Sequence, residues 1–266
     1  MSNDKALSVR GLDVVYNNAV TALSGVSMKV DPGQFVAVLG ANGAGKTTLV
    51  RAITGLLFIH GGAVREGAIS FGDTRIDPEG VGGTVQLGIS QVPEGRMIFP
   101  RLSVEENLLC GASRRKRGPE VDADISRMFE IFPNLASRRK DTAGLLSGGE
   151  QQMLAVGRAL MGAPQLIICD ELSLGLAPMI VKDLFELLKD LNQEGGISVL
   201  VIEQNARIAL ENSDYGYVLE TGRVAIEGPS AELRADKHVQ EFYLGGAGDA
   251  KEAYEAVVAR YRRDPK

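Results

Sequence analysis

The segment from Gly40 to Thr48, with the sequence GANGAGKTT, has residue types suited to binding a polyphosphate. It fits the pattern G-x-x-x-x-G-K-[ST], in which backbone N–H groups surround phosphate oxygens. The Lys46 ammonium should reach the β- and γ-phosphates, and the Thr47 hydroxyl should ligate Mg²⁺. The residues expected to contact a nucleotide here are Gly40, Asn42, Gly43, Ala44, Gly45, Lys46, Thr47 and Thr48. The alternative interpretation is a glycine-rich turn that carries a surface lysine.

Two adjacent carboxylates follow an apolar run later in the chain. The run spans residues 166–169, and Asp170 and Glu171 come directly after it. We expect Asp170 to hold Mg²⁺ directly or through water, and Glu171 to polarise the attacking water as a general base. Solvated acids at the end of a strand are the alternative that this pair leaves open.

A third candidate site is the segment 146–152, with the sequence LSGGEQQ. A helix is expected to begin here, and the N-terminus of a helix attracts anions. The residues that would face such an anion are Ser147, Gly148, Gly149 and Glu150. Ser147 and Glu150 also have the spacing of a capping box, which gives them a structural role compatible with the first.

The elements that must position these side chains read as strands alternating with helices. Continuous apolar runs predict buried strands at Phe35–Leu39, 165–170 and 197–203. Helical spacing of apolar residues predicts helices over 47–57, 148–160 and 181–191. This alternation predicts an α/β fold with a mostly parallel sheet, in which the phosphate loop follows a strand and precedes a helix.

The remaining segments are predicted from shorter patterns. We expect strands at Leu7–Tyr16 and 26–30, and small antiparallel strands with turns over 61–88. The stretch 103–135 turns helical and begins with Ser103 and Glu106, a second possible capping box. Apolar positions at helical spacing over 250–263 predict a terminal helix after a glycine-rich break.

Composition limits the classes of protein that this chain can represent. Its 266 residues carry a net charge of −5, so no global charge favours binding to nucleic acid. The apolar runs are far shorter than the roughly 18 residues of a membrane helix, and the first residues lack a signal-peptide core. We therefore expect the chain to remain in the cytoplasm and to serve a membrane, if it does so, through partners.

Taken together, the three candidate sites resemble the ATP-binding subunits of ABC transporters, and 166–171 resembles their Walker B element. The resemblance implies a P-loop NTPase of ABC type, with a mostly parallel central sheet, an antiparallel β subdomain and a helical subdomain at roughly 101–160. It implies one ATPase domain over 1–244 and an extension over 245–266. In this family, the signature of one subunit covers the ATP that the phosphate loop of another subunit holds, so a second ATPase subunit is required.

Further segments resemble one subfamily, the second ATPase subunit of branched-chain amino acid uptake systems, with urea and amide importers as close relatives. They are 92–96, 99–108, 173–178 and 203–206. By this resemblance Glu94 stands where most members have a Mg²⁺-sensing glutamine and Gln204 where most have a histidine, so Gln204 should contact the γ-phosphate. Ala177 stands where most members have an aspartate, in the loop after Walker B. Leu172 stands where a proline usually follows the catalytic glutamate. An aromatic near Tyr16 stacks on adenine in the family, although a core tyrosine is a serious alternative for Tyr16.

The resemblance implies an ATP-hydrolysing subunit that energises an importer from the cytoplasmic face of the cell membrane. Its partners would be membrane-spanning permease subunits, an identical or paralogous ATPase subunit, and a periplasmic or extracellular binding protein. The alternative is a soluble ABC-type ATPase acting on nucleic acid or ribosomes, which typically carries a coiled-coil insertion or tandem domains. A small-molecule kinase has no use for the segment 146–152.

Overall fold

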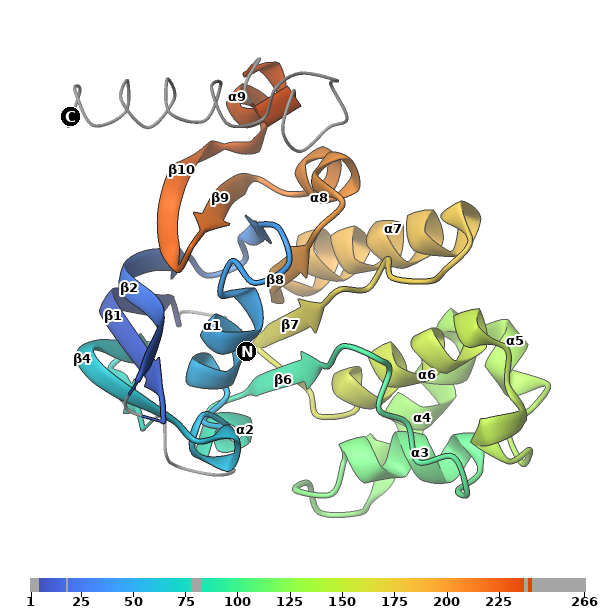
Figure 1. The fold of residues 1–266 in the computed structure, drawn as a ribbon. Helices are drawn as coiled ribbons and strands as arrows, with labels where there is room; N and C mark the ends of the chain where they lie inside the picture. Colours follow the sequence, from blue (N-terminus) through green and yellow to red (C-terminus); the bar gives the residue numbers. More distant parts are fainter. Residues whose placement is uncertain (1–4, 18, 78–82, 237–238, 241–266) are drawn as a thin grey trace.

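The computed structural model describes residues 5–17, 19–77, 83–236 and 239–240 of the chain (Figure 1). The expected extension over 245–266, with its expected helix at 250–263, lies outside the described residues. Of the helices that are described, none is both long enough and apolar enough to cross a membrane.

A six-stranded sheet forms the centre of the molecule, with the strand order β10-β9-β3-β8-β7-β6. Its strands are β3 (Phe35–Leu39), β6 (Ile89–Val92), β7 (Leu166–Asp170), β8 (Ser198–Glu203), β9 (Tyr215–Glu220) and β10 (Arg223–Pro229). Neighbours are parallel from β9 to β6, and β10 pairs with β9 in the antiparallel sense. The predicted α/β fold with a mostly parallel sheet is confirmed.

The three strands predicted from apolar runs, β3, β7 and β8, are buried along their whole length. Alternate side chains of a strand point to opposite faces, so each strand contributes to two cores. In β3, Phe35 packs in the core that contains α6 and α7, whereas Val36 packs in the core that contains α1. Because these strands are parallel, their carboxyl ends meet at one edge of the sheet, where the loops carrying the candidate residues begin.

A second, four-stranded antiparallel sheet has the order β2-β1-β4-β5. Its strands are β1 (Leu7–Tyr16), β2 (Val20–Val30), β4 (Gly62–Phe71) and β5 (Thr74–Ile76). The strand predicted at 26–30 begins six residues earlier than expected, because register shifts against β1 interrupt its alternation. The small antiparallel strands predicted within 61–88 are present as β4 and β5. Residues Gly83–Gln86 form a short helix, α2, that was not predicted.

The other helices are α1 (Lys46–Ile53), α3 (Val104–Gly111), α4 (Pro119–Ile131), α5 (Pro133–Ala136), α6 (Gly148–Leu160), α7 (Pro178–Gly195), α8 (Ala206–Asn212) and α9 (Ser230–Ala235). Short 3₁₀ turns lie at Phe58–His60 and Ala143–Leu145. Helix α1 ends four residues before the predicted Leu57, because the Leu56 N–H bonds to the Arg51 carbonyl (2.8 Å) in a Schellman turn. Helix α7 begins three residues earlier than predicted, with Pro178 in the first turn, where a missing N–H costs nothing.

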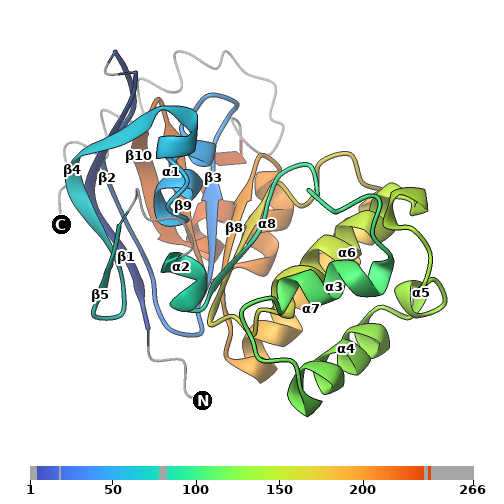
Figure 2. The same ribbon diagram turned by 90° about the horizontal axis from the view of Figure 1, so that it is seen from below.

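The helices α3, α4, α5 and α6 gather beside the central sheet and away from the antiparallel sheet (Figure 2). The single helical stretch predicted over 103–135 is divided into three helices, α3, α4 and α5. The divisions arise because a loop follows Gly111 and because Pro133 starts a new helical turn after Phe132. The capping box predicted at Ser103 is present: its hydroxyl accepts from the Glu106 N–H at 3.2 Å, and Glu106 Oε2 accepts from the Ser103 N–H at 2.7 Å.

Asn107 ties α3 to the segment that leads from the central sheet into this group of helices. The side chain is fully buried, its Oδ1 accepts from the Phe99 N–H at 2.8 Å, and its Nδ2 donates to the Phe99 carbonyl at 3.0 Å and the Ser103 carbonyl at 2.9 Å. We expect Asn107→Ala to lower the free energy of unfolding by about 2–4 kcal/mol, because it leaves buried polar groups unpaired. Denaturant titration measures this loss, and Asn134→Ala, at an exposed position of α5, is the matched control. A loss as small as that of the control would contradict this role.

Candidate functional site

The loop between β3 and α1 forms the floor of the candidate nucleotide site. Gly45, the N-cap of α1, has φ 106°, and a Cβ there would lie 2.7 Å from Leu23 Cδ2. A Cβ at Gly40 would lie 2.5 Å from the Leu219 carbonyl oxygen. Glycine is therefore required at both positions on steric grounds. Helix α1 follows directly, so the predicted context of strand, loop and helix is confirmed.

A pocket of about 470 Å³ opens above this loop, within the size range of small-molecule sites. Its lining comprises Val20, Thr21, Ala22, Asn42, Gly43, Gly45, Lys46, Thr47, Thr48, Glu94, Glu171, Thr221 and Gly222. The pocket brings together predicted residues from the loop, from the end of β7 and from the segment after β6. Sequence reasoning missed five lining residues, because no sequence pattern relates β2 and the β9–β10 turn to a site. They are Val20, Thr21, Ala22, Thr221 and Gly222.

Tyr16 lies next to this pocket but is not among the residues that line it. Its hydroxyl is 3.4 Å from Thr48 Oγ1 and 3.5 Å from Arg51 Nη1, so it packs against α1. Stacking of Tyr16 on adenine stays a prediction.

Lys46 is almost fully buried and faces both the loop and the acidic end of β7. Its Nζ donates to the Gly40 carbonyl at 2.8 Å and to the Ala41 carbonyl at 3.2 Å, and lies 3.4 Å from Glu171 Oε1. The side chain is 5% exposed, and that of Glu171 is 11% exposed. Lys46 is therefore a buried cation whose partners in this structure are two backbone carbonyls of the loop and the carboxylate of Glu171.

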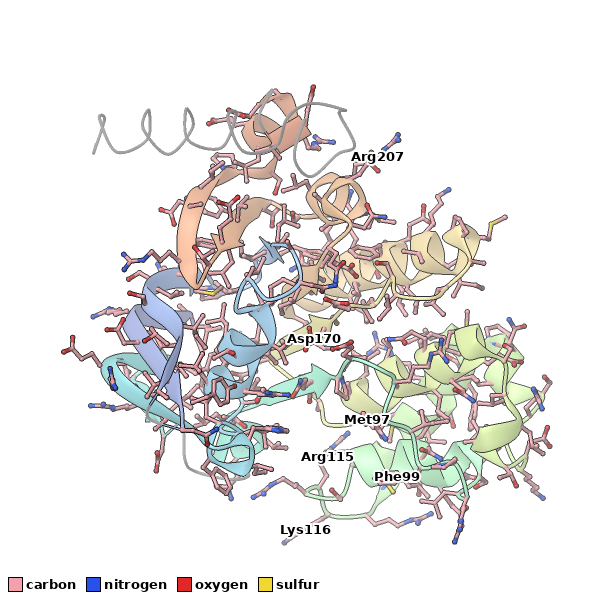
Figure 3. All side chains as sticks on the ribbon, viewed as in Figure 1. Met97, Phe99, Arg115, Lys116, Asp170 and Arg207 are labelled. Carbon is pink, nitrogen blue, oxygen red and sulfur yellow. The ribbon has the colours of Figure 1, made fainter. Side chains whose placement is uncertain are left out.

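Asp170 ends β7 as a buried carboxylate in an acidic environment (Figure 3). Burial, and then the charges of Glu171, Glu94 and Glu203, raise the pKa of Asp170 to about 6, while Lys46 opposes the shift. Within the described residues, its Oδ1 is buried and lacks a hydrogen-bond partner. An unpaired buried carboxylate oxygen among other acids fits a divalent cation with hard oxygen ligands. Asp170 itself does not line the pocket, whereas Thr47, Glu94 and the adjacent Glu171 do.

Glu171 stands just beyond the strand with φ 51°, a strained conformation for a residue with a side chain. Its N–H donates to the Ile202 carbonyl at 2.8 Å, which holds this turn against β8. Gln204, after β8, donates from Nε2 to Glu171 Oε1 at 3.2 Å and also to Asn42 Oδ1. The amide of Gln204 therefore joins the general-base candidate to the phosphate loop.

Glu203 is a residue that reasoning from the sequence left without a role. It is 1% exposed, and burial raises its pKa. Its carboxylate accepts from the Ser173 N–H at 2.9 Å and from the Ser173 hydroxyl at 2.6 Å, so it anchors the loop that follows Glu171. The available signal was a carboxylate directly after the apolar run 199–202, at the last position of β8.

The segment 146–152 lies at the start of α6, in the group of helices, and its residues are not among those that line the pocket. Ser147 caps α6, and the predicted capping box with Glu150 is present. Gly148 lies against the Arg96 guanidinium, which a Cβ would approach to 3.0 Å. The described residues of one chain therefore do not bring Ser147, Gly148, Gly149 and Glu150 to the phosphate loop.

Comparison with known proteins agrees with this geometry. A family model described as ABC transporter matches residues 23–173. The high-affinity branched-chain amino acid transport ATP-binding protein BraG of Pseudomonas aeruginosa is 41% identical over 87% of this chain and 96% of its own length. The crystal structure of a nucleotide-free ATP-binding cassette from an ABC transporter is 29% identical, with a TM-score of 0.76 over 92% of this chain and 100% of its own.

A further solved cassette shares the fold and is described as a dimer in a post-hydrolysis state with ADP and Pi. It is 22% identical, with a TM-score of 0.72 over 84% of this chain and 98% of its own. The family match spans more than half of the chain, and the relative BraG is aligned over nearly its whole length. This chain therefore belongs to the ABC transporter family, as an ATP-binding subunit that hydrolyses ATP.

Proposed function

We propose that this subunit energises a membrane importer of branched-chain amino acids or of related small amino acids and amides. The observation that carries the proposal is the convergence of Lys46, Asp170, Glu171 and Gln204 at one edge of the sheet, in a chain 41% identical to an ATP-binding protein of branched-chain amino acid transport. The alternative, a soluble ABC-type ATPase acting on nucleic acid or ribosomes, is not favoured by these relatives.

The predicted residues around the phosphate loop have proposed parts in hydrolysis. Lys46 and the loop N–H groups would bind the phosphates, and Thr47, Asp170 and Glu94 would hold Mg²⁺. The ion would neutralise charge on the β- and γ-phosphates. Glu171 would accept a proton from the attacking water, and one N–H of Gln204 would orient Glu171. The second N–H, which donates to Asn42 in this structure, would turn to the γ-phosphate. Glutamine can donate a hydrogen bond to the γ-phosphate but cannot carry a charge that depends on pH, unlike the histidine that most family members have at this position.

Two such subunits would close around two ATP molecules. In this arrangement Ser147, Gly148, Gly149 and Glu150 of one subunit face the γ-phosphate that the other subunit's loop holds, and α6 directs its N-terminus at the anion. ATP drives closure because it contacts both subunits in the closed state and one in the open state. We propose 1–244 as the ATPase domain, with α3 to α6 inside a helical subdomain at 101–160.

The proposed partners are a second ATPase subunit, permease subunits and a substrate-binding protein, with this chain on the cytoplasmic face of the membrane. The segment 94–100 is the proposed permease contact, because Met97 is 67% exposed and Phe99 48% exposed (Figure 3). Arg158 of α6 donates to the Met97 carbonyl at 2.7 Å and lies 5.2 Å from the centre of the Phe99 ring. Movement of α6 on closure would therefore reach this segment directly.

Reconstitution tests the proposed substrate. Proteoliposomes that contain this subunit, a second ATPase subunit and the permease subunits should take up leucine or isoleucine when ATP and the binding protein are supplied. Uptake should stop with Glu171→Gln in this subunit. ATP-dependent uptake of a chemically unrelated solute, with no response to branched-chain amino acids, would contradict the substrate while leaving the ATPase assignment intact.

Gln204→Ala should slow ATP hydrolysis about tenfold or more, because Glu171 loses the donor that orients its carboxylate. Affinity for ATP should change much less, since Lys46 and the loop remain. Steady-state hydrolysis and nucleotide binding measure the two effects separately. Gln193→Ala, exposed on α7, is the matched control. Equal rates for the two variants would remove Gln204 from the reaction.

A further inference from the structure

The guanidinium of Arg138 is fixed against the first turn of α6. Its Nη1 donates to Glu150 Oε2 at 3.2 Å, its Nε to Asp141 Oδ2 at 2.9 Å, and its Nη2 to the Leu145 carbonyl at 3.3 Å. Each of its three nitrogens thus has a separate acceptor, although the side chain is 30% exposed. A guanidinium shared between the carboxylates of Asp141 and Glu150 is therefore held in place beside the segment 146–152.

Glu150 places a negative charge within that same segment. Its Oε2 accepts from the Ser147 N–H at 2.7 Å as well as from Arg138. Hydrogen bonds from Ser147, and then the charge of Arg138, hold the pKa of Glu150 below its ordinary value, although partial burial opposes them. Glu150 is therefore a carboxylate at neutral pH, three residues after Ser147 at the start of the helix.

An uncompensated carboxylate at this position would work against the proposed closure. The γ-phosphate of the other subunit's ATP is negatively charged, and like charges repel most strongly where an interface excludes water. We propose that Arg138 is a positioning residue that neutralises Glu150, so that a signature bearing a carboxylate can accept a nucleotide polyphosphate from the partner subunit. The inference rests on the proposed function, because it requires a second subunit's ATP to reach α6.

A purely structural role for Arg138 makes a different prediction. Its bonds to Asp141 and Leu145 brace the loop before α6, and loss of this brace would harm closure whatever residue stands at 150. Neutralisation, in contrast, makes the effect of losing Arg138 depend on the charge at 150. Glutamine at 150 keeps the capping geometry and removes the charge, so it separates the two roles.

The test compares four proteins that all carry Glu171→Gln: this variant alone, and this variant with Arg138→Gln, with Glu150→Gln, or with both. Light scattering gives the Mg-ATP concentration at which half of each protein associates with itself or with its paralogue. Arg138→Gln should raise this concentration about five- to tenfold, and added salt should reduce the difference. The double variant should return to within about twofold of the starting protein. Arg127→Gln, exposed on α4, controls for the loss of net charge.

Two outcomes would overturn the inference, and they are distinguishable. If the double variant is as impaired as Arg138→Gln alone, Arg138 acts as a brace and not through the charge of Glu150. If the protein that carries Glu171→Gln alone forms no two-subunit complex in the presence of Mg-ATP, either with itself or with its paralogue, the proposed closure fails and the inference fails with it. Affinity of each monomer for a fluorescent ATP analogue should stay unchanged, since Arg138 is not among the residues that line the pocket.

Discussion

Glu171→Gln should lower the rate of ATP hydrolysis by at least about 100-fold while ATP still binds. The carboxylate is the base candidate nearest to the phosphate loop, 3.4 Å from Lys46 Nζ and 3.2 Å from Gln204 Nε2. Glutamine has nearly the same shape but cannot accept the proton of the attacking water. Steady-state phosphate release and equilibrium binding of a fluorescent ATP analogue measure the two quantities.

The control for this variant is Glu186→Gln, at a position 58% exposed on α7. It makes the same chemical change away from the pocket and should hydrolyse ATP at the rate of the unaltered protein. If Glu171→Gln retains more than about a third of that rate, the base lies elsewhere. In that case Asp170 and Glu203, the buried carboxylates next to it, become the candidates to examine.

Lys46→Ala should weaken ATP binding itself by about 10- to 100-fold. A charge-assisted hydrogen bond contributes about 1.5–3 kcal/mol, and each 1.4 kcal/mol corresponds to a factor of ten in affinity. Loss of Lys46 also leaves Asp170 and Glu171 without their nearest cation, which adds repulsion toward the phosphates. Calorimetric titration with ATP in the presence of Mg²⁺ gives the affinity directly.

Lys182→Ala, 69% exposed on α7, removes the same charge at a distance from the pocket and should bind ATP normally. Thermal unfolding of both variants without nucleotide shows whether either has lost its fold. An affinity for ATP that Lys46→Ala leaves unchanged, in a folded protein, would take Lys46 out of its assigned role.

The strands that carry the chemistry were predictable because their signal is simple. β3, β7 and β8 are buried on both faces, so they read as continuous apolar runs, and parallel pairing brings their carboxyl ends together. β2 was predicted too short, since its register shifts break the alternation that identifies a half-buried strand. No strand was predicted at β9 or β10, because both carry polar residues at their ends and lack an apolar run of that kind.

The residues of the site were predictable by type, but their mutual contacts were not. Lys46, Asp170 and Glu171 stand in recognisable patterns, whereas the bonds from Gln204 to Glu171 and to Asn42 join segments far apart in the sequence. The anchor from Glu203 to Ser173 likewise depends on how the loop after β7 packs over β8. Such contacts follow from tertiary packing, for which a single sequence carries no local signal.

The central claim is that ATP is held between two ATPase subunits, and light scattering on Glu171→Gln tests it most directly. The variant should be monomeric without nucleotide and with ADP, and should form a two-subunit complex with Mg-ATP, alone or with its paralogue. Ser147→Arg should abolish that complex while the monomer still binds ATP. A monomer that binds ATP fully yet never associates, with itself or with the paralogue, would contradict the account.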